Sequence, residues 1–488
     1  MTLIFSGNDY KYELESVVKL FFPAQLFNLL YDERNADGDL CFMRKKAGRK
    51  MTYLYAYVRI GEETSHLSSK IMSNTEDLDN KCELELSRLL FICLEKLTGK
   101  RPEWGLITGV RPVKRVNRML DEGYNEEEIR ETLKHKYLVS DNKISLSIKT
   151  ASSQKKILDT LSSDSFSLYV SIPFCPTRCS YCSFISQSLE KTKNITDAYV
   201  ENLCKEISYT GKLAKDLGLK LDTVYFGGGT PTAISADQLE ALMSTVNTSF
   251  DLSHLREYTV EAGRADTITK EKLEVIKNNL ATRISINPQT LNDDVLKAIG
   301  RKHTVKQVLE SFELARRIGF DNINMDVIAG LPTDTLISFV NTIDRIVELD
   351  PENITVHTLS IKRAADLNRG DRDVLHNPAP EMVDYASKKL IECGYSPYYL
   401  YRQKNMLGNL ENTGYSKQGK ESLYNIFIME EVQTILATGA GASTKLVSDS
   451  NIERIYNYKH PLEYNKHFEL MLEKKQAIID FINMKGTI

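Results

Sequence analysis

Three cysteines lie close together in one short stretch of the sequence. Cys175, Cys179 and Cys182 have the spacing CxxxCxxC within SLYVSIPFCPTRCSYCSFIS. Three thiolates on one loop can bind a single metal centre. A structural zinc site would normally have a fourth Cys or His at comparable spacing, but the next cysteine is Cys204, in a predicted helix. Three ligands leave one position open, which favours a [4Fe–4S] cluster whose fourth iron takes an external ligand over a zinc site.

Composition and charge indicate the compartment and the kinds of partner to expect for this protein. Eight cysteines in 488 residues are too few for a disulfide scaffold, so the thiols are expected to be reduced. Lys and Arg total 63 against 66 Asp and Glu, a formal net charge of -3 that predicts no nucleic-acid partner. The start, MTLIFSGNDYKYELE, is not a secretory signal, and no apolar run approaches the ~20 residues of a membrane span. We therefore expect a cytoplasmic protein without a membrane span.

The elements that position the cysteines change character along the chain. From Ser167, strand-like segments alternate with helix-like ones, and the strands are SLYVSIP, TVYFGG, YTVEA, TRISIN, NINMDVIAG and NITVHTLS. This alternation predicts an α/β fold of parallel βαβ units, either an open doubly wound sheet or a complete or partial barrel. The cysteines follow the first of these strands. We expect residues 161–395 to form this core.

The flanking regions are expected to form separate parts. Residues 1–160 are predicted to be an α+β domain, with one helix over residues 13–30 and a hairpin from Cys41–Arg44 to Met51–Ile60. The aromatic and glycine-rich residues 396–488 are predicted to be a C-terminal extension that covers the active site.

Two basic segments need an interpretation as well. RKKAGRK (residues 44–50) and RPVKR (residues 111–115) are most simply solvated turns. Their arginines would also suit a ligand with several carboxylates.

Polar residues and glycines occur where the predicted strands end, which is where α/β proteins bind ligands. Gly227, Gly228 and Gly229, followed by Thr230, end the second strand. Backbone without side chains can approach a ligand closely there, although a tight turn would also explain the glycines.

Further candidates follow on the next strands. Glu261 ends the third strand, Gln289 and Arg301 follow the fourth, and Asp326 ends the fifth. Loop caps or structural ion pairs are the alternative roles for Glu261 and Asp326. Tyr169, six residues before Cys175, could orient reacting groups or simply pack in its strand.

These motifs resemble a known superfamily. CxxxCxxC after the first strand of a βα series is similar to the radical S-adenosylmethionine (SAM) superfamily. LYVSIPFCPTRCSYCSF together with FGGGTPT resembles its oxygen-independent coproporphyrinogen III oxidase family. The long N-terminal region and the late segment YRQKNMLGNLENTGYS are most similar to the HemZ-type branch. The resemblance implies a partial (β/α) TIM-like barrel with an N-terminal α+β domain and a C-terminal extension.

The resemblance also implies cofactors and residue roles. Cys175, Cys179 and Cys182 would hold a [4Fe–4S] cluster, and Tyr169 would lie beside it and assist catalysis. One or two SAM molecules would be bound by Tyr169, Gly228, Gly229, Thr230, Glu261, Gln289, Arg301 and Asp326. The expected reaction is oxidative decarboxylation of two propionates of coproporphyrinogen III, with electrons from a donor such as flavodoxin or ferredoxin.

One position departs from the family pattern. The decarboxylases have a fourth cysteine in CxxxCxxCxC, and this chain has Phe184 there. Related haem chaperones share that loss, but their late HNxxYW-like segment is replaced here by SLYNIFIME. A haem chaperone and a radical SAM methyltransferase that opens haem anaerobically therefore remain alternatives, with haem as the tetrapyrrole.

Overall fold

The computed structural model describes residues 1–23, 25–31, 37–182, 187–360, 377–403, 406–448 and 451–485. The chain divides into two units, Met1–Ile148 with Arg402–Leu410 and Lys149–Tyr401 with Glu411–Ile488. The division into three domains remains a prediction. Among the described residues, no helix combines the length and apolar character that crossing a membrane requires.

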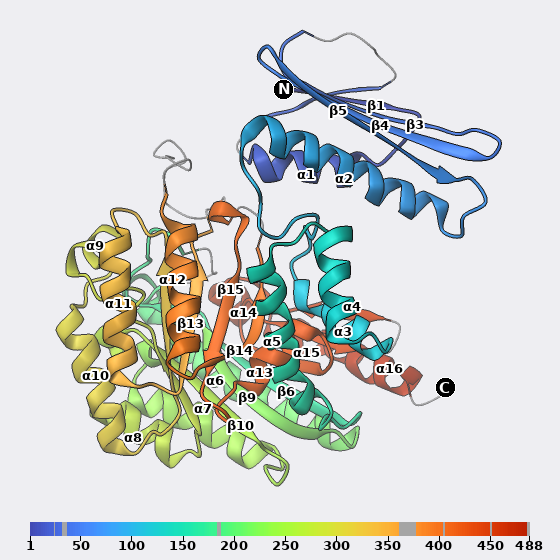
Figure 1. The fold of residues 1–488 in the computed structure, drawn as a ribbon. Coiled ribbons are helices and arrows are strands. Elements are labelled where there is room, and N and C mark those ends of the chain that lie inside the picture. The colour runs from blue at the N-terminus through green and yellow to red at the C-terminus, as the bar shows by residue number, and fades with distance from the viewer. Residues whose placement is uncertain are drawn as a thin grey trace. The chain divides into compact units, whose positions relative to one another are not determined.

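The first unit begins with a five-stranded sheet in the order β2-β1-β3-β4-β5. Its elements are β1 (Thr2–Ser6), α1 (Lys11–Phe21), β2 (Asn28–Tyr31), β3 (Leu40–Lys46), β4 (Met51–Ile60), β5 (Glu63–Met72) and α2 (Leu78–Thr98). In Figure 1, α1 and α2 lie on the same face of this sheet. Alternate strand residues such as Phe5, Met43 and Val58 pack there against Leu14 and Leu90. The predicted hairpin is confirmed, because β3 and β4 pair antiparallel.

The predicted single helix over residues 13–30 is wrong. The helix ends at Phe21, and Asn28–Tyr31 forms a strand that pairs parallel with β1. Pro23 explains the end of the helix, because proline lacks the N–H that a helix interior needs and restricts the residue before it.

Short helices complete the first unit and lead into the second. They are α3 (Pro112–Asp121), α4 (Glu126–Glu131), a π-helical turn (Thr132–Lys136) and α5 (Asp141–Leu158). Asn125 and Glu128 form a reciprocal capping box at the start of α4.

The second unit is built on parallel strands joined by helices, as the alternation predicted. The strands are β6 (Ser165–Ile172), β9 (Lys220–Gly228), β10 (Glu257–Gly263), β11 (Arg283–Ile286), β12 (Ile323–Ala329) and β13 (Asn353–Thr358). The helices are α6 (Leu189–Asp216), α7 (Ala236–Ser249), α8 (Lys270–Asn278), α9 (Asp293–Ala298), α10 (Val305–Ile318), α11 (Leu336–Leu349) and α12 (Ala379–Glu392). Ser235 and Thr304 cap α7 and α10 with capping boxes, so local sequence sets where these helices begin.

The C-terminal segment extends this sheet at both edges. It comprises β14 (Ser396–Tyr401), β15 (Asn412–Ser416), α13 (Leu423–Glu430), β16 (Thr434–Thr438), β17 (Ser443–Val447), β18 (Ile452–Tyr456), α14 (Pro461–Lys466), α15 (Phe468–Lys474) and α16 (Gln476–Lys485). β15 pairs with β13, and β16 pairs parallel with β6. Among the described strands, the edge strands β14 and β18 are not paired with each other.

A buried charged cluster attaches the C-terminal helices to α6. The Glu206 carboxylate is fully buried and lies 3.0 Å from the Lys475 ammonium. It also accepts hydrogen bonds from Tyr464, Asn457 and the backbone N–H of Gly439, at 2.6–2.8 Å. Each group is therefore satisfied only while the others stay in place.

Removing one partner of this buried pair should be costly. We expect Lys475→Met to lower the free energy of unfolding by about 3–5 kcal/mol, because it leaves the buried Glu206 carboxylate without its cation. Chemical denaturation followed by circular dichroism measures the change. The double variant Glu206→Gln with Lys475→Met should recover part of the loss. A loss below about 1 kcal/mol in the single variant would contradict this assignment.

Candidate active site

The cysteine loop is held against the glycines that end β9. Cys175 ends the two-residue strand β7 (Phe174–Cys175), which pairs with β8 (Gln187–Ser188). The backbone N–H of Gly229 donates to Ile172 O, and that of Thr230 to Phe174 O, both at 2.8 Å. A Cβ on Gly229 would lie 2.5 Å from Phe174 O and 3.0 Å from Cys175 Sγ. The close approach requires glycine here, and the protein's own backbone fills the space.

The three cysteines share this loop but differ in exposure. Cys179 is buried, Cys175 and Cys182 are half-buried, and the Cys182 N–H donates to Cys179 O at 3.0 Å. Cys175 Sγ lies 3.5 Å from Thr230 Oγ1. Within the described ranges, no three His, Cys, Asp or Glu side chains are grouped to hold a metal ion. Phe184 lies outside the described residues.

Arg264 brings a positive charge to the cysteine loop. Its Nη1 donates to Thr177 O at 3.0 Å and lies 3.9 Å from Cys179 Sγ. Asp266 fixes this guanidinium with two hydrogen bonds of 2.9 and 2.6 Å. Burial acts to raise the pKa of Asp266, but the nearby His303 and the hydrogen bonds from Arg264 outweigh it and hold the pKa well below its ordinary value. A cation fixed in this way suits thiolate ligands.

Arg301 contacts the cysteine loop, and both Arg301 and Gln289 have a buried polar atom without a partner. Arg301 donates to Asn287 O at 2.6 Å and to the Tyr181 hydroxyl at 3.2 Å, while its buried Nε has no partner. Gln289 is 7% exposed, has a φ of 67°, and its buried Oε1 also lacks a partner. Left-handed backbone in a glutamine and orphaned buried polar atoms are costly, and they are typical of sites that a ligand completes.

Glu261 is oriented by a tyrosine on the neighbouring strand. The Tyr225 hydroxyl donates to Glu261 Oε1 at 2.5 Å. Burial raises the pKa of Glu261 to about 7; Asp326 adds to the rise, and Tyr225, Arg283 and His357 oppose it. The carboxyl group therefore changes charge near neutral pH.

Asp326 is held in its charged form. It accepts a hydrogen bond from Asn324 Nδ2 at 2.7 Å and lies 3.6 Å from His357 Nε2. Burial acts to raise the pKa of Asp326, but the nearby His357, the hydrogen bond from Asn324 and the neighbouring Thr355 hold it below its ordinary value. The backbone of Asp326 also accepts the Gln289 N–H at 2.9 Å, which joins these two predicted residues.

Tyr169, which is partly buried, stacks with the buried Tyr225 and Tyr424. Its ring lies 6.2 Å from Tyr225 and 6.1 Å from Tyr424, and the latter two rings are 4.4 Å apart and nearly parallel. The Glu261 charge raises the pKa of Tyr169 further than burial alone does. Tyr169, Tyr225, Glu261 and Asp326 thus form one group.

Sequence reasoning missed Tyr225, Tyr424 and Arg264. Tyr225 could have been found, because it lies two residues before Gly227 and so shares its face of β9. Arg264 follows β10 directly in EAGR. Tyr424 lies on α13, nearly 200 residues after β9, and no local pattern signals its approach.

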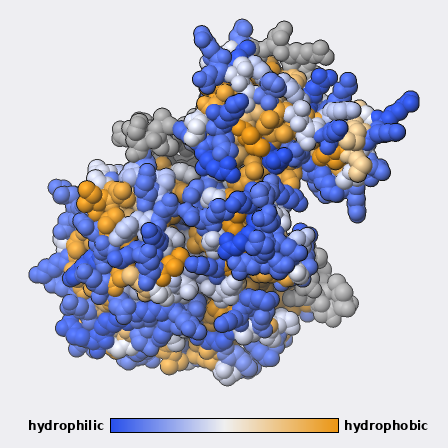
Figure 2. All heavy atoms as spheres, in the orientation of Figure 1, coloured by the Kyte–Doolittle hydropathy of each residue, from blue (hydrophilic) through white to orange (hydrophobic). Residues whose placement is uncertain are grey.

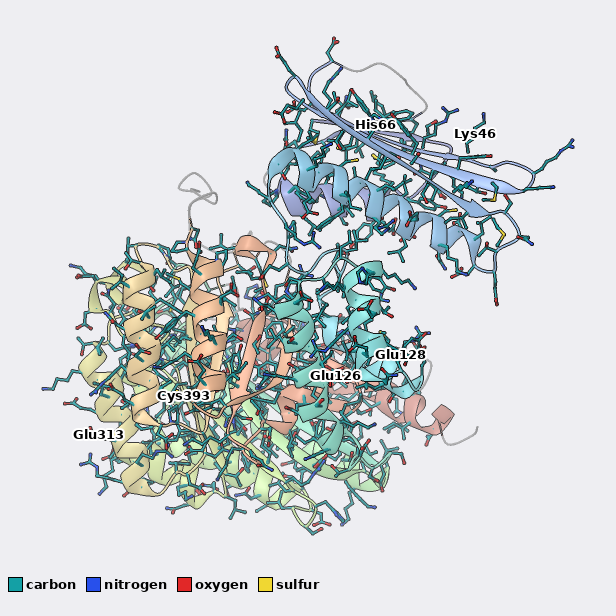
Figure 3. All side chains as sticks on the ribbon, viewed as in Figure 1. Lys46, His66, Glu126, Glu128, Glu313 and Cys393 are labelled. Carbon is teal, nitrogen blue, oxygen red and sulfur yellow. The ribbon has the colours of Figure 1, made fainter. Side chains whose placement is uncertain are left out.

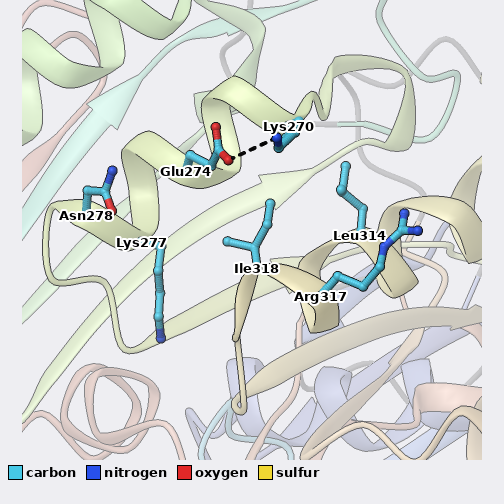
Figure 4. A pocket seen from close by; sticks show the side chains of 7 residues that line it. All are labelled: Lys270, Glu274, Lys277, Asn278, Leu314, Arg317 and Ile318. Atoms are coloured by element: carbon cyan, nitrogen blue, oxygen red, sulfur yellow. Dashed lines mark ion pairs between the residues drawn. The ribbon is translucent and has the colours of Figure 1, made fainter.

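A groove between α8 and α10 is separate from the group formed by Tyr169, Tyr225, Glu261 and Asp326. Figure 4 shows its lining, which consists of Lys270, Glu274, Lys277, Asn278, Leu314, Arg317 and Ile318. None of these is among the predicted site residues. Figure 2 shows hydrophilic residues over most of the visible face of the second unit, as expected for its outer helices.

Comparison with known proteins decides the family. Residues 169–346 match the model of the radical SAM superfamily. The chain is 42% identical over 402 residues to the oxygen-independent coproporphyrinogen-III oxidase-like protein HemZ of Bacillus subtilis, covering 81% of this chain and 80% of that protein. The chain belongs to the HemZ family of radical SAM proteins.

This HemZ-family chain is also 32% identical over 321 residues to the haem chaperone HemW of Lactococcus lactis, covering 64% and 79% of the two chains. Among solved structures, coproporphyrinogen III oxidase (HemN) of Escherichia coli matches with a TM-score of 0.49 and 21% identity, over 66% of this chain and 73% of that one.

The residues present fit the cofactors of the superfamily. Radical SAM proteins use a [4Fe–4S] cluster and SAM. Three thiols on one loop beside Arg264 supply a suitable donor set for the cluster. The orphaned atoms of Gln289 and Arg301 offer one acceptor and one donor to a polar ligand. The assignment of single residues to SAM remains a prediction.

The affinity for SAM should rise with pH. SAM carries net positive charge and hydroxyl donors, so it favours the ionised carboxylate, whereas the folded protein without ligand holds the proton on Glu261 below pH 7. The protonated Glu261 carboxyl group contributes to the stability of the folded protein, and this contribution is lost as the pH rises through about 7. We expect affinity to increase about tenfold from pH 6 to pH 8 by anaerobic calorimetric titration. Glu261→Gln should remove this dependence and Glu274→Gln should keep it. A flat profile in the unsubstituted protein would exclude Glu261 from the SAM site.

The cluster should depend on the three loop cysteines alone. Replacing Cys175, Cys179 and Cys182 with Ala is expected to abolish the visible absorption of the reconstituted cluster, because no thiolate remains to bind iron. Cys204→Ala, in α6, is the matched control and should retain the spectrum. Full absorption in the triple variant would contradict the assignment.

Proposed function

We propose that the chain is an oxygen-independent coproporphyrinogen III dehydrogenase, which converts two propionates of coproporphyrinogen III to the vinyls of protoporphyrinogen IX. The observation that carries the proposal is the 42% identity, over 81% of the chain, to a coproporphyrinogen-III oxidase-like protein. The side chains of Glu261, Gln289 and Asp326 support it, because they would supply acceptors for SAM.

The chemistry requires one hydrogen atom and one electron to leave for each vinyl formed. When bound, the cluster and SAM supply the radical that removes the hydrogen atom from the propionate β-carbon. Carbon dioxide then leaves, and the remaining electron passes to an acceptor. A reduced flavodoxin or ferredoxin would supply the electron that starts each turnover.

The chain's own residues contribute positioning and exclusion of water. Tyr225 orients the Glu261 carboxylate through its 2.5 Å hydrogen bond. Gly229 and Thr230 hold the cysteine loop against the end of β9. The stack of Tyr169, Tyr225 and Tyr424 forms a buried aromatic wall beside Glu261. A wall of this kind limits water near a reactive radical.

A haem chaperone is the second candidate. It is favoured by the similarity to HemW, at 32% identity over 64% of this chain. A chaperone would bind haem in fixed stoichiometry and leave its carboxylates intact.

One anaerobic experiment separates these functions. The reconstituted protein is incubated with SAM, a chemical reductant and coproporphyrinogen III, and the tetrapyrroles are analysed by mass spectrometry. We expect a product that has lost two carboxyl groups, together with 5′-deoxyadenosine and methionine. Cleavage of SAM with an unchanged tetrapyrrole would reject the dehydrogenase. Stoichiometric binding of haem without turnover would assign the chaperone, and a methylated linear tetrapyrrole from haem would assign the haem-opening methyltransferase.

A further inference from the structure

The face of the first unit's sheet opposite α1 and α2 carries an aromatic cluster. The register of β3, β4 and β5 brings Phe42 opposite Tyr57, and Tyr57 opposite His66, on this face. Tyr55 lies 6.2 Å from Phe42 and 6.2 Å from His66, measured between ring centroids. Tyr53, further along β4, is 54% exposed. No described helix of this unit covers these rings (Figure 1).

Cations surround the rings on the same face. Arg44 and Lys46 follow Phe42 on β3, Arg59 follows Tyr57 on β4, and Lys70 pairs with Tyr53 across the strands. Figure 3 labels Lys46 and His66 on the strands of this sheet. The residues of β3, β4 and β5 on this face include no Asp or Glu. Arg44, Lys46 and Lys70 form no ion pair with another residue that the structure describes.

The turn between β3 and β4 adds to this charge. Arg49 and Lys50 are exposed there, in the basic segment (residues 44–50) that is interpreted most simply from the sequence as a solvated turn. The opposite face of the same strands is apolar and packs on the helices. Folding of the unit therefore accounts for the inward side chains and leaves this combination of rings and cations unexplained.

The combination fits one class of partner. Single-stranded nucleic acids are bound by aromatic side chains on which bases stack, together with Lys and Arg that contact the phosphates. Alternate residues of a strand lie about 6.8 Å apart, so Tyr53, Tyr55 and Tyr57 present a row of rings along β4. A lipid surface would favour apolar tips, whereas all of these rings except Phe42 end in a hydroxyl or an imidazole.

We propose that this open face, formed by β3, β4 and β5, binds single-stranded nucleic acid. The proposal is independent of the dehydrogenase assignment, since it involves no residue of the second unit. It departs from the expectation drawn from the net charge, because that charge averages over both units.

The test uses the full-length protein and a fluorescently labelled single-stranded RNA of mixed sequence, followed by fluorescence anisotropy at several salt concentrations. We expect saturable binding that weakens with salt, with a slope of about −0.7 per phosphate contact on a double-logarithmic plot. Tyr53→Ala, at the most exposed ring, and the pair Tyr55→Ala with Tyr57→Ala should each weaken binding about tenfold or more. Arg44→Gln with Lys46→Gln should weaken binding at low salt and reduce the slope by about one phosphate contact or more.

Matched controls lie on the helices. Tyr12→Ala on α1, whose ring is 66% exposed, and Lys81→Gln on α2 should leave affinity unchanged. Thermal unfolding of each variant establishes that the sheet is intact. Absence of RNA binding at low salt, or equal losses in the face variants and the controls, would overturn the proposal. Loss of coproporphyrin or anionic-vesicle binding in the face variants, with no RNA bound by the unsubstituted protein, would overturn it as well.

Discussion

The end of β6 is confined on both sides by backbone that approaches too closely for any side chain. On one side, a Cβ on Gly229 would lie 2.5 Å from Phe174 O. On the other, a Cβ on Gly439 would lie 2.5 Å from Ser171 O, and the Ser171 hydroxyl donates to Ala440 O at 2.8 Å. The cysteine loop begins where β6 ends. Its start is therefore held in place by Gly229, over 50 residues later in the chain, and by Gly439, over 260 residues later. The GAGA segment at Gly439 therefore acts beside the site as a structural wall.

A buried carboxylate also ties the C-terminal segment to the core strands of the second unit. Glu257 accepts hydrogen bonds from Ser422 Oγ at 3.1 Å and from the Leu423 N–H at 2.6 Å, at the start of α13. A carboxylate at a helix N-terminus is favoured by the helix dipole. This contact positions α13 so that Tyr424 stacks on Tyr225, which in turn holds Glu261. The orientation of the Glu261 carboxyl group thus depends on a helix from the C-terminal segment.

Local signals explain why much of this could be predicted. Alternation of apolar strands with capped helices gave the parallel core, and Glu261 lies near the end of β10 as expected. The expectation that Asp326 ends its strand is wrong, because Asp326 lies in the middle of β12. The error over residues 13–30 arose where apolar periodicity was followed through Pro23, although the strand Asn28–Tyr31 is only four residues long. Tyr424 and Arg264 could not be assigned because their roles depend on contacts across the sheet. The geometry of the three thiols likewise depends on the loop as a whole.

Packing in the folded state explains the residue types on one face of the first unit's sheet but not those on the other face. Inward residues such as Phe5, Cys41 and Val58 are nearly inaccessible and stabilise the unit by apolar burial. Outward positions carry no packing requirement, and β-propensity alone favours tyrosine there. Propensity disfavours Lys as it disfavours Asp and Glu, so it does not explain why that face of three strands carries cations without acidic residues. A formal net charge of -3 conceals this separation, because acidic residues elsewhere in the 488-residue chain offset it. Charge is informative about partners only when it is counted by face, after the register of the strands is known.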